Sequence, residues 1–418
     1  MKKNAIVSFR GQKDIAATIN LTGSKSESNR ALIISALSKG VVKVENLSDA
    51  ADTVILNRIL RDLEINPATE KQTVDVGHAG TAMRFLTAYL STLPQQFTLT
   101  GSGRMQERPI AILVDALKTL GADISYEKNE GYPPLNINGG LNSDAAEVSI
   151  KGNVSSQYLS ALLIIAPTLP LGLRLKIEGG LTSRPYLEMT LNMLAATGIQ
   201  HEWSDDTIYI APQKHQEATL VVEPDWSAAS YWYSITSLAD TGDITLTNMR
   251  EESLQGDSKI QEIMIALGVR TSRVPDGIEL KTGTSVDIQE VLNLKDCPDL
   301  AQTIIVCAAA KGLNLSFTGL ETLKIKETNR ILALQQELAK IGVTLNEDNE
   351  VYTLNCDALA FPEKMTIATY DDHRMAMAFA PLSLLIKEVE IEDYQVVEKS
   401  YPDFWKDLET AGFTVNEL

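Results

Sequence analysis

Residues 23–40 read GSKSESNRALIISALSKG, and the pattern of this stretch returns along the whole chain. It opens with small and polar residues suited to a helix N-cap and continues as a mostly apolar run. A helix that is apolar on all sides is typical of a protein core. The alternating run VVKVENL comes next, so the sequence predicts a buried helix that leads into a strand.

Five similar stretches follow this one, each with its own strand-like segment. They are GHAGTAMRFLTAYLS, SSQYLSALLIIAPTLPLG, DWSAASYWYSITSLADTG, PDLAQTIIVCAAAKG and DDHRMAMAFAPLSLLI. The predicted buried helices begin near residues 24, 79, 155, 226, 298 and 371, which makes the repeat about 55–76 residues long. Most repeats add a second, amphipathic helix that ends at a glycine, as in RPIAILVDALKTLGADI.

Six repeats divide most simply into three and three. The segment EATLVVEPD at 217–225 separates the third repeat from the fourth, and the periodicity predicts a domain boundary there. A single extended array of repeats is the alternative. A length of 418 residues also favours two domains of about 200 residues. Proteins with two similar halves usually place the active site between them.

The composition, with 44% hydrophobic and 22% charged residues, is that of a globular protein. A net charge of −18 argues against nucleic acid or an anionic membrane as a partner, although local cations can still bind a small anion. No apolar run is long enough for a membrane helix, and the N-terminus does not have the pattern of a signal peptide. We therefore expect a cytoplasmic protein.

The cysteines and histidines give no metal-binding or disulfide pattern. The three cysteines have no paired spacing, so we expect buried, reduced thiols at Cys297, Cys307 and Cys356. The four histidines fit no known metal spacing; they are His78, His201, His215 and His373. The sequence therefore predicts a protein without a metal.

Cations and hydroxyls stand at predicted helix N-termini in five of the six repeats, where free N–H groups and the helix dipole attract anions. A Lys or Arg at such a position is usually a surface charge, and a Ser is usually an ordinary cap. Recurrence changes that interpretation and indicates one cleft that binds a small substrate with several anionic groups. Asp299 and Glu327 lie beside Lys326 and Arg330, as ion-pair partners or as an acid/base pair, and together they favour the second.

The motifs GSKSESNRAL, GHAGTAMR, RMQERP, VSSQYLSALL, SRPY, PDLAQT, KETNR, DDHRMAM and EKSYPDF occur in an order that resembles the EPSP synthase (5-enolpyruvylshikimate-3-phosphate synthase) family of enolpyruvyl transferases. The resemblance spans residues 5 to about 415. It implies an α/β fold of two similar domains, each of three βαβαββ units with buried parallel helices. Residues 20–222 would form one domain, residues 1–19 and 226–418 the other, and the active-site cleft would lie between them.

The resemblance also implies a reaction. The enolpyruvyl group of phosphoenolpyruvate would pass to the 5-hydroxyl of shikimate-3-phosphate, with release of phosphate, in the shikimate pathway that makes chorismate and the aromatic amino acids. The route would be addition and elimination through a tetrahedral intermediate, with no metal or organic cofactor. We expect a monomer whose partners are these two substrates, not nucleic acid or a membrane.

Roles carry over from the family residue by residue. Asp299 would accept a proton, Glu327 would donate one, and Lys25 would lie between both ligands. The residues that would bind shikimate-3-phosphate are Lys25, Ser26, Arg30, Ser155, Ser156, Gln157, Ser183, Asp299 and Lys326. Those that would bind phosphoenolpyruvate are Lys25, Gly80, Arg108, Gln157, Arg330, Arg374 and Lys399.

Five positions depart from the family pattern: His78 for Asn, Phe85 for Pro, Thr322 for Asn, Asn329 for Asp, and Glu27 for a small or apolar residue. None removes a charge that the chemistry needs, but they bear on the affinity for phosphoenolpyruvate and its mimic glyphosate. Residues two apart on a helix differ by about 200°, so Glu27 should face away from Lys25 as a bystander on the back of the helix. At i,i+3 it could still reach Arg30.

Three other functions would require different sequence features. A UDP-N-acetylglucosamine enolpyruvyl transferase would show G-A-K-N in place of GSKS and a reactive cysteine in a Gly-rich loop, and this chain has neither. An inactive homologue that senses a phosphorylated metabolite would not need both Asp299 and Glu327, so the presence of both with the whole set of cations argues against this function. A phosphoryl-transfer enzyme would need a nucleotide loop or a pair of Mg²⁺-binding carboxylates, and this sequence shows neither.

Overall fold

The structure is a computed structural model, and it describes residues 3–65, 71–141, 145–285 and 289–418. Contacts within the chain divide it into two compact units. Unit 1 comprises Met1–Thr22 and Pro224–Leu418, and unit 2 comprises Gly23–Glu223. The chain therefore passes from one unit to the other twice, after Thr22 and after Glu223.

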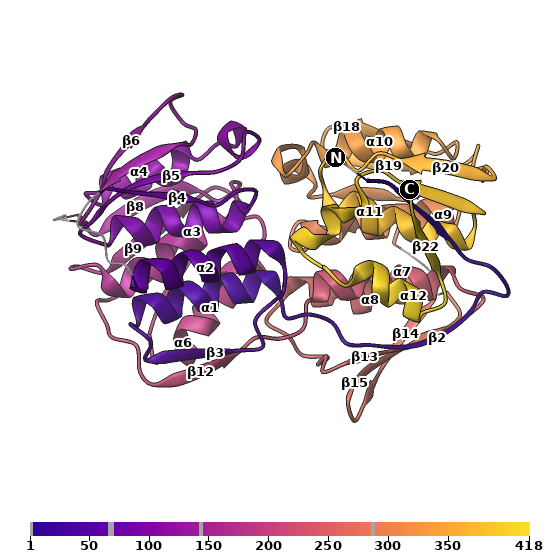
Figure 1. Ribbon diagram of the computed structural model, residues 1–418, viewed down its shortest axis with the longest axis horizontal. Helices are drawn as coiled ribbons and strands as arrows, with labels where there is room; N and C mark the ends of the chain where they lie inside the picture. The colour runs from indigo at the N-terminus through magenta and orange to yellow at the C-terminus, as the bar shows by residue number, and fades with distance from the viewer. Residues whose placement is uncertain (1–2, 66–70, 142–144, 286–288) are drawn as a thin grey trace. The chain divides into compact units, whose positions relative to one another are not determined.

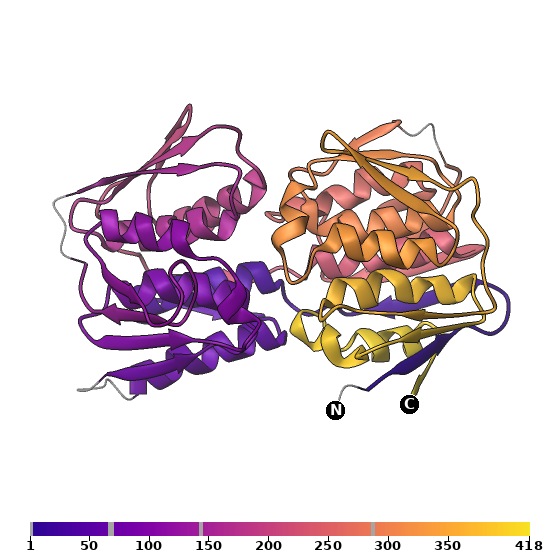
Figure 2. The ribbon, with the colours of Figure 1, turned by 90° about the horizontal axis from the view of Figure 1, so that it is seen from above.

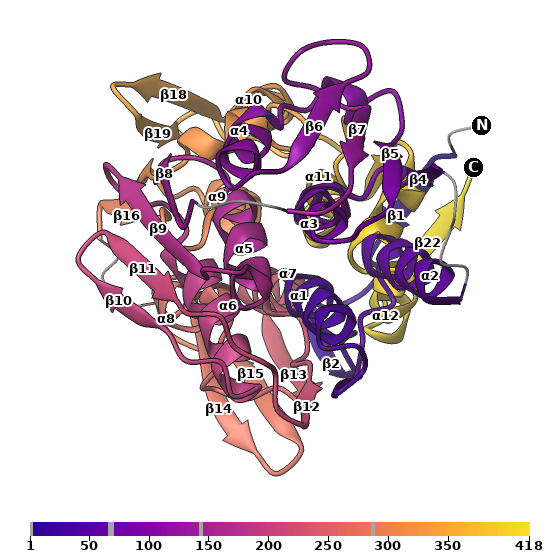
Figure 3. The same ribbon diagram turned by 90° about the vertical axis from the view of Figure 1, so that its left-hand side faces the viewer.

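Three buried helices in mutual contact form the centre of unit 2 (Figures 1 and 3). They are α1 (Lys25–Leu37), α3 (Gly80–Ser91) and α5 (Ser156–Ile165). Every residue of α3 is buried, as the all-round apolar pattern predicts. The second helices of the repeats are α2 (Ala51–Ile65), α4 (Ala111–Thr119) and α6 (Arg184–Ala196).

The strands of unit 2 surround these helices (Figure 3). Two sheets have four strands, in the orders β4-β5-β7-β6 and β10-β11-β9-β8, and β12 pairs with β3 in a two-stranded sheet. Their bounds are β3 (Val42–Glu45), β4 (Gln72–Asp75), β5 (Gln96–Thr100), β6 (Asp123–Tyr126), β7 (Leu135–Asn138), β8 (Glu147–Lys151), β9 (Leu173–Glu178), β10 (Glu202–Ser204), β11 (Thr207–Ile210) and β12 (Ala218–Val221). β9 alternates buried and exposed side chains along its length, because successive side chains of a strand point to opposite faces.

Unit 1 repeats this plan with the other three apolar runs. Its central helices are α7 (Trp226–Leu238), α9 (Ala301–Ala310) and α11 (His373–Phe379), which contact one another. Its second helices are α8 (Ile260–Ala266), α10 (Arg330–Ala339) and α12 (Phe404–Thr410). All ten residues of α9 are buried, including Cys307.

The sheets of unit 1 have the orders β14-β15-β13-β2, β16-β17-β19-β18 and β20-β21-β1-β22. The N-terminal strands complete two of them: β2 runs parallel to β13, and β1 lies between β21 and β22, so both ends of the chain belong to one sheet (Figure 2). Their bounds are β1 (Ala5–Ser8), β2 (Asp14–Ile19), β13 (Thr241–Thr247), β14 (Val269–Val274), β15 (Gly277–Thr282), β16 (Val291–Asn293), β17 (Ser316–Thr318), β18 (Thr344–Asp348), β19 (Val351–Asn355), β20 (Lys364–Ile367), β21 (Glu388–Ile391) and β22 (Thr414–Glu417).

Each four-stranded sheet joins one parallel pair to two antiparallel pairs, as in β4 parallel to β5, β5 antiparallel to β7, and the hairpin of β6 and β7. This is the pairing that a βαβαββ repeat requires, because a parallel pair needs a crossover helix while a hairpin needs only a turn. Cys297, Cys307 and Cys356 are all buried and free, as predicted. In the parts of the chain that the structure describes, no helix is long and apolar enough to cross a membrane.

Candidate active site

The N-terminal ends of α9, α10 and α11, three helices in contact, bring distant charged residues of unit 1 together. Asp299 lies in the 3-10 helix η4 (Pro298–Leu300), directly before α9. Glu327 lies between the 3-10 helix η5 (Glu321–Ile325) and α10, whose first residue is Arg330. Arg374 is the second residue of α11. The repeats thus position each group at a helix start, where the backbone dipole favours anions.

Three cations hold the carboxylate of Asp299. Arg374 donates from Nη2 to Oδ2 at 2.8 Å, Arg330 donates from Nη1 to Oδ1 at 3.1 Å, and Lys326 Nζ lies 3.5 Å from Oδ1. Burial opposes the charge of Asp299, but these cations outweigh it and hold the pKa of the carboxyl well below its ordinary value of 3.8. Asp299 is therefore ionised at neutral pH.

Arg330 connects this carboxylate to two others. Its guanidinium is buried; Nε donates to Asp372 Oδ2 at 2.7 Å and Nη2 donates to Glu327 Oε2 at 2.9 Å. Burial lowers the pKa of Arg330, but Asp372, Glu327 and Asp299 outweigh that effect and raise it. Lys399, at the end of the 3-10 helix η7 (Tyr394–Lys399), approaches Glu327 Oε1 at 3.5 Å. Such a network depends on the planar fork of arginine.

Arg374 is oriented by its backbone and by its side chain. Asp372 caps α11 and accepts the backbone N–H of Arg374 at 2.9 Å. The guanidinium donates from Nη1 to the Tyr231 hydroxyl at 3.4 Å and from Nη2 to the Ser227 hydroxyl at 3.3 Å. Both of these partners are on α7, so α7 takes part in the site although its repeat begins without a cation.

In unit 2, the buried side chain of Arg30 connects three helices by hydrogen bonds. It donates to Thr190 at 2.7 Å on α6, to Ser160 at 3.0 Å on α5, and to the Ser26 carbonyl at 2.8 Å on its own helix. Its guanidinium carbon lies 5.5 Å from the ring centre of Phe85. Burial lowers the pKa of Arg30 to about 10, so it keeps its charge at neutral pH. Phe85, a departure from the family pattern, thus packs against a predicted ligand of shikimate-3-phosphate.

Other helix starts of unit 2 carry the remaining predicted residues. Arg108 packs on Gly80: a Cβ at Gly80 would lie 2.5 Å from Nη1, so a larger residue there would displace the Arg108 guanidinium. Gln157 donates from Nε2 to Thr81 at 3.1 Å, which links α5 to α3. Ser155 and Ser183 are the N-cap residues of α5 and α6. Ser156 opens α5 itself, and Lys25 and Ser26 open α1.

The structure therefore divides the predicted residues into two sets, one in each unit. Direct ion pairs join the members in unit 1, which are Asp299, Lys326, Glu327, Arg330, Arg374 and Lys399. The members in unit 2 stand in or beside α1, α3, α4, α5 and α6, and are Lys25, Ser26, Arg30, Gly80, Arg108, Ser155, Ser156, Gln157 and Ser183.

The prediction that Glu27 is a bystander on the back of α1 is wrong. Glu27 is 2% exposed, and its Oε2 accepts the backbone N–H of Glu223 at 2.9 Å. The backbone N–H of Ser24 donates to the Glu223 carbonyl at 2.7 Å. The start of α1 therefore bonds both the N–H and the carbonyl of Glu223, the last residue before the second crossing. The helix phase gave the direction of the side chain, but the segment that packs there comes from almost 200 residues away.

The other departures have local explanations or none. Asn329 caps α10, accepting the backbone N–H of Leu332 at 3.2 Å, which the usual Asp would also do. His78 is exposed. Nothing in the structure explains Thr322.

Sequence reasoning gave no role to Asp372, Tyr231 or Ser227. Asp372 stands directly before a predicted helix in DDHRMAM, and an Asp at that position signals a cap, but its bond to Arg330 joins residues 42 apart. Ser227 was visible only as a hydroxyl near the start of the fourth apolar run. No spacing rule connects Asp372 to Arg330, or Ser227 and Tyr231 to Arg374.

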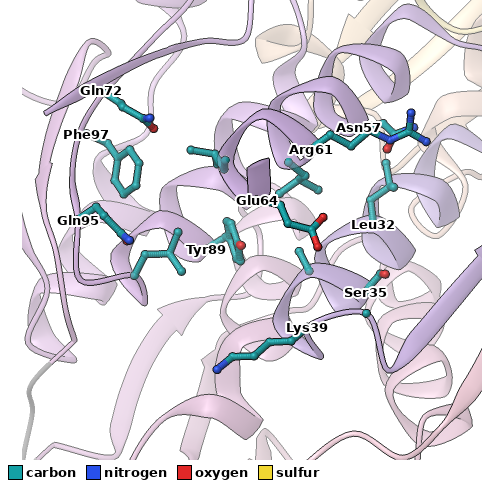
Figure 4. A pocket seen from close by; sticks show the side chains of 15 residues that line it. Leu32, Ser35, Lys39, Asn57, Arg61, Glu64, Gln72, Tyr89, Gln95 and Phe97 are labelled. Atoms are coloured by element: carbon teal, nitrogen blue, oxygen red, sulfur yellow. The ribbon is translucent and has the colours of Figure 1, made fainter. Parts of the chain in front are cut away.

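Unit 2 also contains a cavity of about 400 Å³ that is separate from these residues (Figure 4). Its lining comes from α1, α2, α3 and neighbouring strands, and it includes Lys39, Arg61, Glu64 and Tyr89. Burial and Glu64 raise the pKa of Tyr89. None of the predicted site residues lines this cavity.

Comparison with known proteins assigns a family. Residues 9–408 match the family of EPSP synthase (3-phosphoshikimate 1-carboxyvinyltransferase). The 3-phosphoshikimate 1-carboxyvinyltransferase of Bacteroides fragilis is 47% identical over 404 residues, which cover 96% of each chain. The protein of that name from Shewanella sediminis is 35% identical over 419 residues, covering 94% of this chain and 96% of the relative.

Solved structures confirm the predicted fold class. The EPSP synthase of Acinetobacter baumannii matches with a TM-score of 0.79 at 19% identity, covering 99% of this chain and 100% of that one. The enolpyruvyl transferase NikO of Streptomyces tendae matches with a TM-score of 0.72 at 14% identity, covering 100% and 99%. From the match of 400 residues and the identity to its relatives, the chain belongs to the EPSP synthase family.

Proposed function

We propose that this chain transfers the enolpyruvyl group of phosphoenolpyruvate to the 5-hydroxyl of shikimate-3-phosphate and releases phosphate. The observation that supports it most strongly is the pair of carboxylates, Asp299 and Glu327, that share Arg330 within a cluster of four cations. The reaction needs one group that donates a proton and another that accepts one. The cations are needed to bind the anionic groups of the substrates.

The anionic groups of the substrates account for the cations of both sets. In this proposal the carboxylate and phosphate of phosphoenolpyruvate bind Arg330, Arg374 and Lys399 in unit 1, and Lys25, Gly80, Arg108 and Gln157 in unit 2. Shikimate-3-phosphate binds the hydroxyls of Ser26, Ser155, Ser156 and Ser183, together with Lys25, Arg30, Gln157, Lys326 and Asp299. Arginine suits carboxylate and phosphate because its fork donates two parallel hydrogen bonds.

The reaction then proceeds by addition and elimination. Glu327 protonates the methylene carbon of phosphoenolpyruvate, Asp299 accepts the proton of the 5-hydroxyl, and the hydroxyl oxygen attacks the carbon that carries the phosphate. The tetrahedral adduct loses phosphate, and its new methyl group returns a proton to restore the methylene. No redox change occurs, and the released phosphate carries the departing electron pair.

Because the pKa of Asp299 is low, the mechanism requires that substrate binding raise it. A carboxylate held by three cations is a weak base. Phosphoenolpyruvate brings its own anions to Arg374 and Arg330, so these cations are shared and the pKa of Asp299 rises. In this proposal the binding of phosphoenolpyruvate makes Asp299 a stronger base.

A reaction run in D₂O tests the mechanism. The methyl group of the adduct contains one solvent deuteron, so part of the product must carry deuterium in its methylene group. Product without deuterium would contradict an addition–elimination route. Glu327→Gln should lose turnover and still bind shikimate-3-phosphate, while Glu321→Gln, a nearby carboxylate outside the cluster, serves as the matched control. Turnover of Glu327→Gln near that of the wild type would remove Glu327 as the donor.

A further inference from the structure

The fourth repeat, whose apolar helix begins without a cation, contributes a buried carboxylate to the site. Asp257 lies in the 3-10 helix η3 (Gly256–Lys259) and is 3% exposed. Ser227, in the first turn of α7, donates its hydroxyl hydrogen to Asp257 Oδ2. The Ser227 oxygen accepts the hydrogen bond from Nη2 of Arg374 at 3.3 Å. Asp257 is therefore connected to Arg374 through one hydroxyl group.

This connection fixes one side of the Arg374 guanidinium. Its Nη2 donates both to Ser227 and, at 2.8 Å, to Asp299 Oδ2, while Nη1 donates to Tyr231. A serine hydroxyl rotates freely unless a partner accepts its hydrogen. With Asp257 as that acceptor, the Ser227 lone pairs are turned toward Arg374, and the plane of the guanidinium is set.

The environment of Asp257 makes its charge costly. Its Oδ1 is buried and has no hydrogen-bond partner among the residues that the structure describes. The charged groups that act on it are Asp225 from the start of α7, Asp299 from η4 and Arg374 from α11, and the buried Cys297 thiol, whose pKa Asp257 raises, also faces it. Lys259, on its own 3-10 helix, pairs with Glu262 at the surface. Burial and Asp299 raise the pKa of Asp257 to about 7 from its ordinary 3.8, against the opposing effect of Arg374.

We propose that Asp257 is a positioning residue for Arg374, which it orients through Ser227, and that its ionisation weakens the hold of this arginine on the anionic substrate. The inference rests on the proposed function, in which Arg374 binds phosphoenolpyruvate. When Asp257 is protonated, the full field of the guanidinium acts on the substrate. When Asp257 is ionised, its negative charge offsets part of that field. The affinity for phosphoenolpyruvate should therefore fall as Asp257 ionises.

Three variants separate the positioning of Arg374 by Asp257 from the effect of the charge of Asp257. Asp257→Asn keeps an oxygen that accepts from Ser227 but cannot ionise, and Asp257→Ala removes both features. Asp407→Asn is the matched control, because Asp407 also accepts a hydroxyl hydrogen in unit 1, from Tyr401 at 2.6 Å, and burial also raises its pKa. Phosphate release gives kcat and the KM of each substrate. The ratio of wild type to variant at one pH cancels the titration of phosphoenolpyruvate itself.

We expect Asp257→Ala to raise the KM for phosphoenolpyruvate about tenfold, with the KM for shikimate-3-phosphate and kcat changed by less than about threefold. Asp257→Asn should match the wild type near pH 6 and have a KM for phosphoenolpyruvate about fivefold lower than the wild type near pH 8.5. Asp407→Asn should show neither effect. A KM for phosphoenolpyruvate that is unchanged in both Asp257 variants at both pH values would overturn the proposal.

A second measurement needs no substrate. In a denaturant double-mutant cycle, Asp257→Asn and Arg374→Gln should be non-additive by at least about fivefold in the unfolding equilibrium constant. Additivity in this cycle would also count against the connection. Failure of the proposed function gives a different result, namely a wild-type protein that folds but releases no phosphate with these substrates, while the cycle still reports the coupling of Asp257 to Arg374.

Discussion

Asp372 and Arg330 are both buried, and Nε of Arg330 donates to Oδ2 of Asp372 at 2.7 Å. The other oxygen of Asp372 accepts the backbone N–H of Arg374 at 2.9 Å. One carboxylate thus fixes the two arginines that hold Asp299. The positions of these charges are set by the starts of α10 and α11, not by flexible side chains at the surface.

Replacing Arg330 by lysine should destabilise the protein even though the charge is kept. Lysine cannot reach Asp372, Glu327 and Asp299 together, so at least one carboxylate would lose its buried partner. We expect a loss of about 2–4 kcal/mol in the free energy of unfolding, measured in urea, together with a large fall in kcat. Arg184→Lys, in an exposed pair with Glu188, should change stability by less than about 0.5 kcal/mol. Equal effects of the two substitutions would contradict the buried network.

Asp299→Asn should lower kcat by roughly 10²–10⁴-fold, because the amide cannot accept the hydroxyl proton. The substitution should also change the pH dependence of stability. The pKa of Asp299 is lower in the folded protein than in the unfolded chain, so its contribution is complete at neutral pH and is lost as the pH falls below about 4. The stability difference between wild type and variant should shrink over that acidic range. A difference that stays constant would show that the cations do not act on Asp299.

Glu27→Ala should destabilise the protein by about 1–3 kcal/mol, because the N–H of the half-buried Glu223 would lose the Glu27 carboxylate as its acceptor. Glu27→Gln keeps an oxygen at the same place and should cost much less. Neither change should raise the affinity for shikimate-3-phosphate more than about twofold, as measured by calorimetric titration. A large gain in affinity with unchanged stability would mean that Glu27 opposes the substrate and does not support α1.

The cap of α10 offers a test of a departure from the family pattern. Asn329→Ala removes the acceptor for the Leu332 N–H and should cost about 1 kcal/mol in thermal or urea unfolding. Asn329→Asp restores the common residue and should stay within about 0.5 kcal/mol of the wild type. A destabilising Asn329→Asp would show that repulsion from carboxylates such as the nearby Glu327 matters more than the cap.

The local part of the fold could be predicted from the sequence. Five of the six apolar runs become α-helices that begin within two residues of the predicted starts; in the fifth run η4 begins at Pro298 and α9 follows from Ala301. N-caps and all-round apolarity are properties of neighbouring residues. In the last run, DDHRMAMAFAPLSLLI, α11 ends at Phe379 and the 3-10 helix η6 (Ala380–Leu384) continues, with Pro381 unable to donate to the helix.

The long-range part could not be predicted from these patterns. β1 pairs with β21, joining Ala5 to Ile391, and no local pattern specifies that partner. The charged residues of the site could be found because they recur at the predicted helix starts, and the family motifs gave them their roles. Ser227 and Asp257 were not found, because the bond between them depends on how α7 packs beside η3. The prediction that Glu27 is a bystander was wrong for the same reason, since its partner Glu223 belongs to a distant segment.

The most direct test of the central claim measures phosphate release from phosphoenolpyruvate with two alternative acceptors. With shikimate-3-phosphate the account predicts steady release, and with UDP-N-acetylglucosamine it predicts none. All three cysteines are buried, in agreement with this choice of acceptor. Release only with UDP-N-acetylglucosamine would contradict the assigned substrate, and release with neither acceptor would contradict catalysis itself.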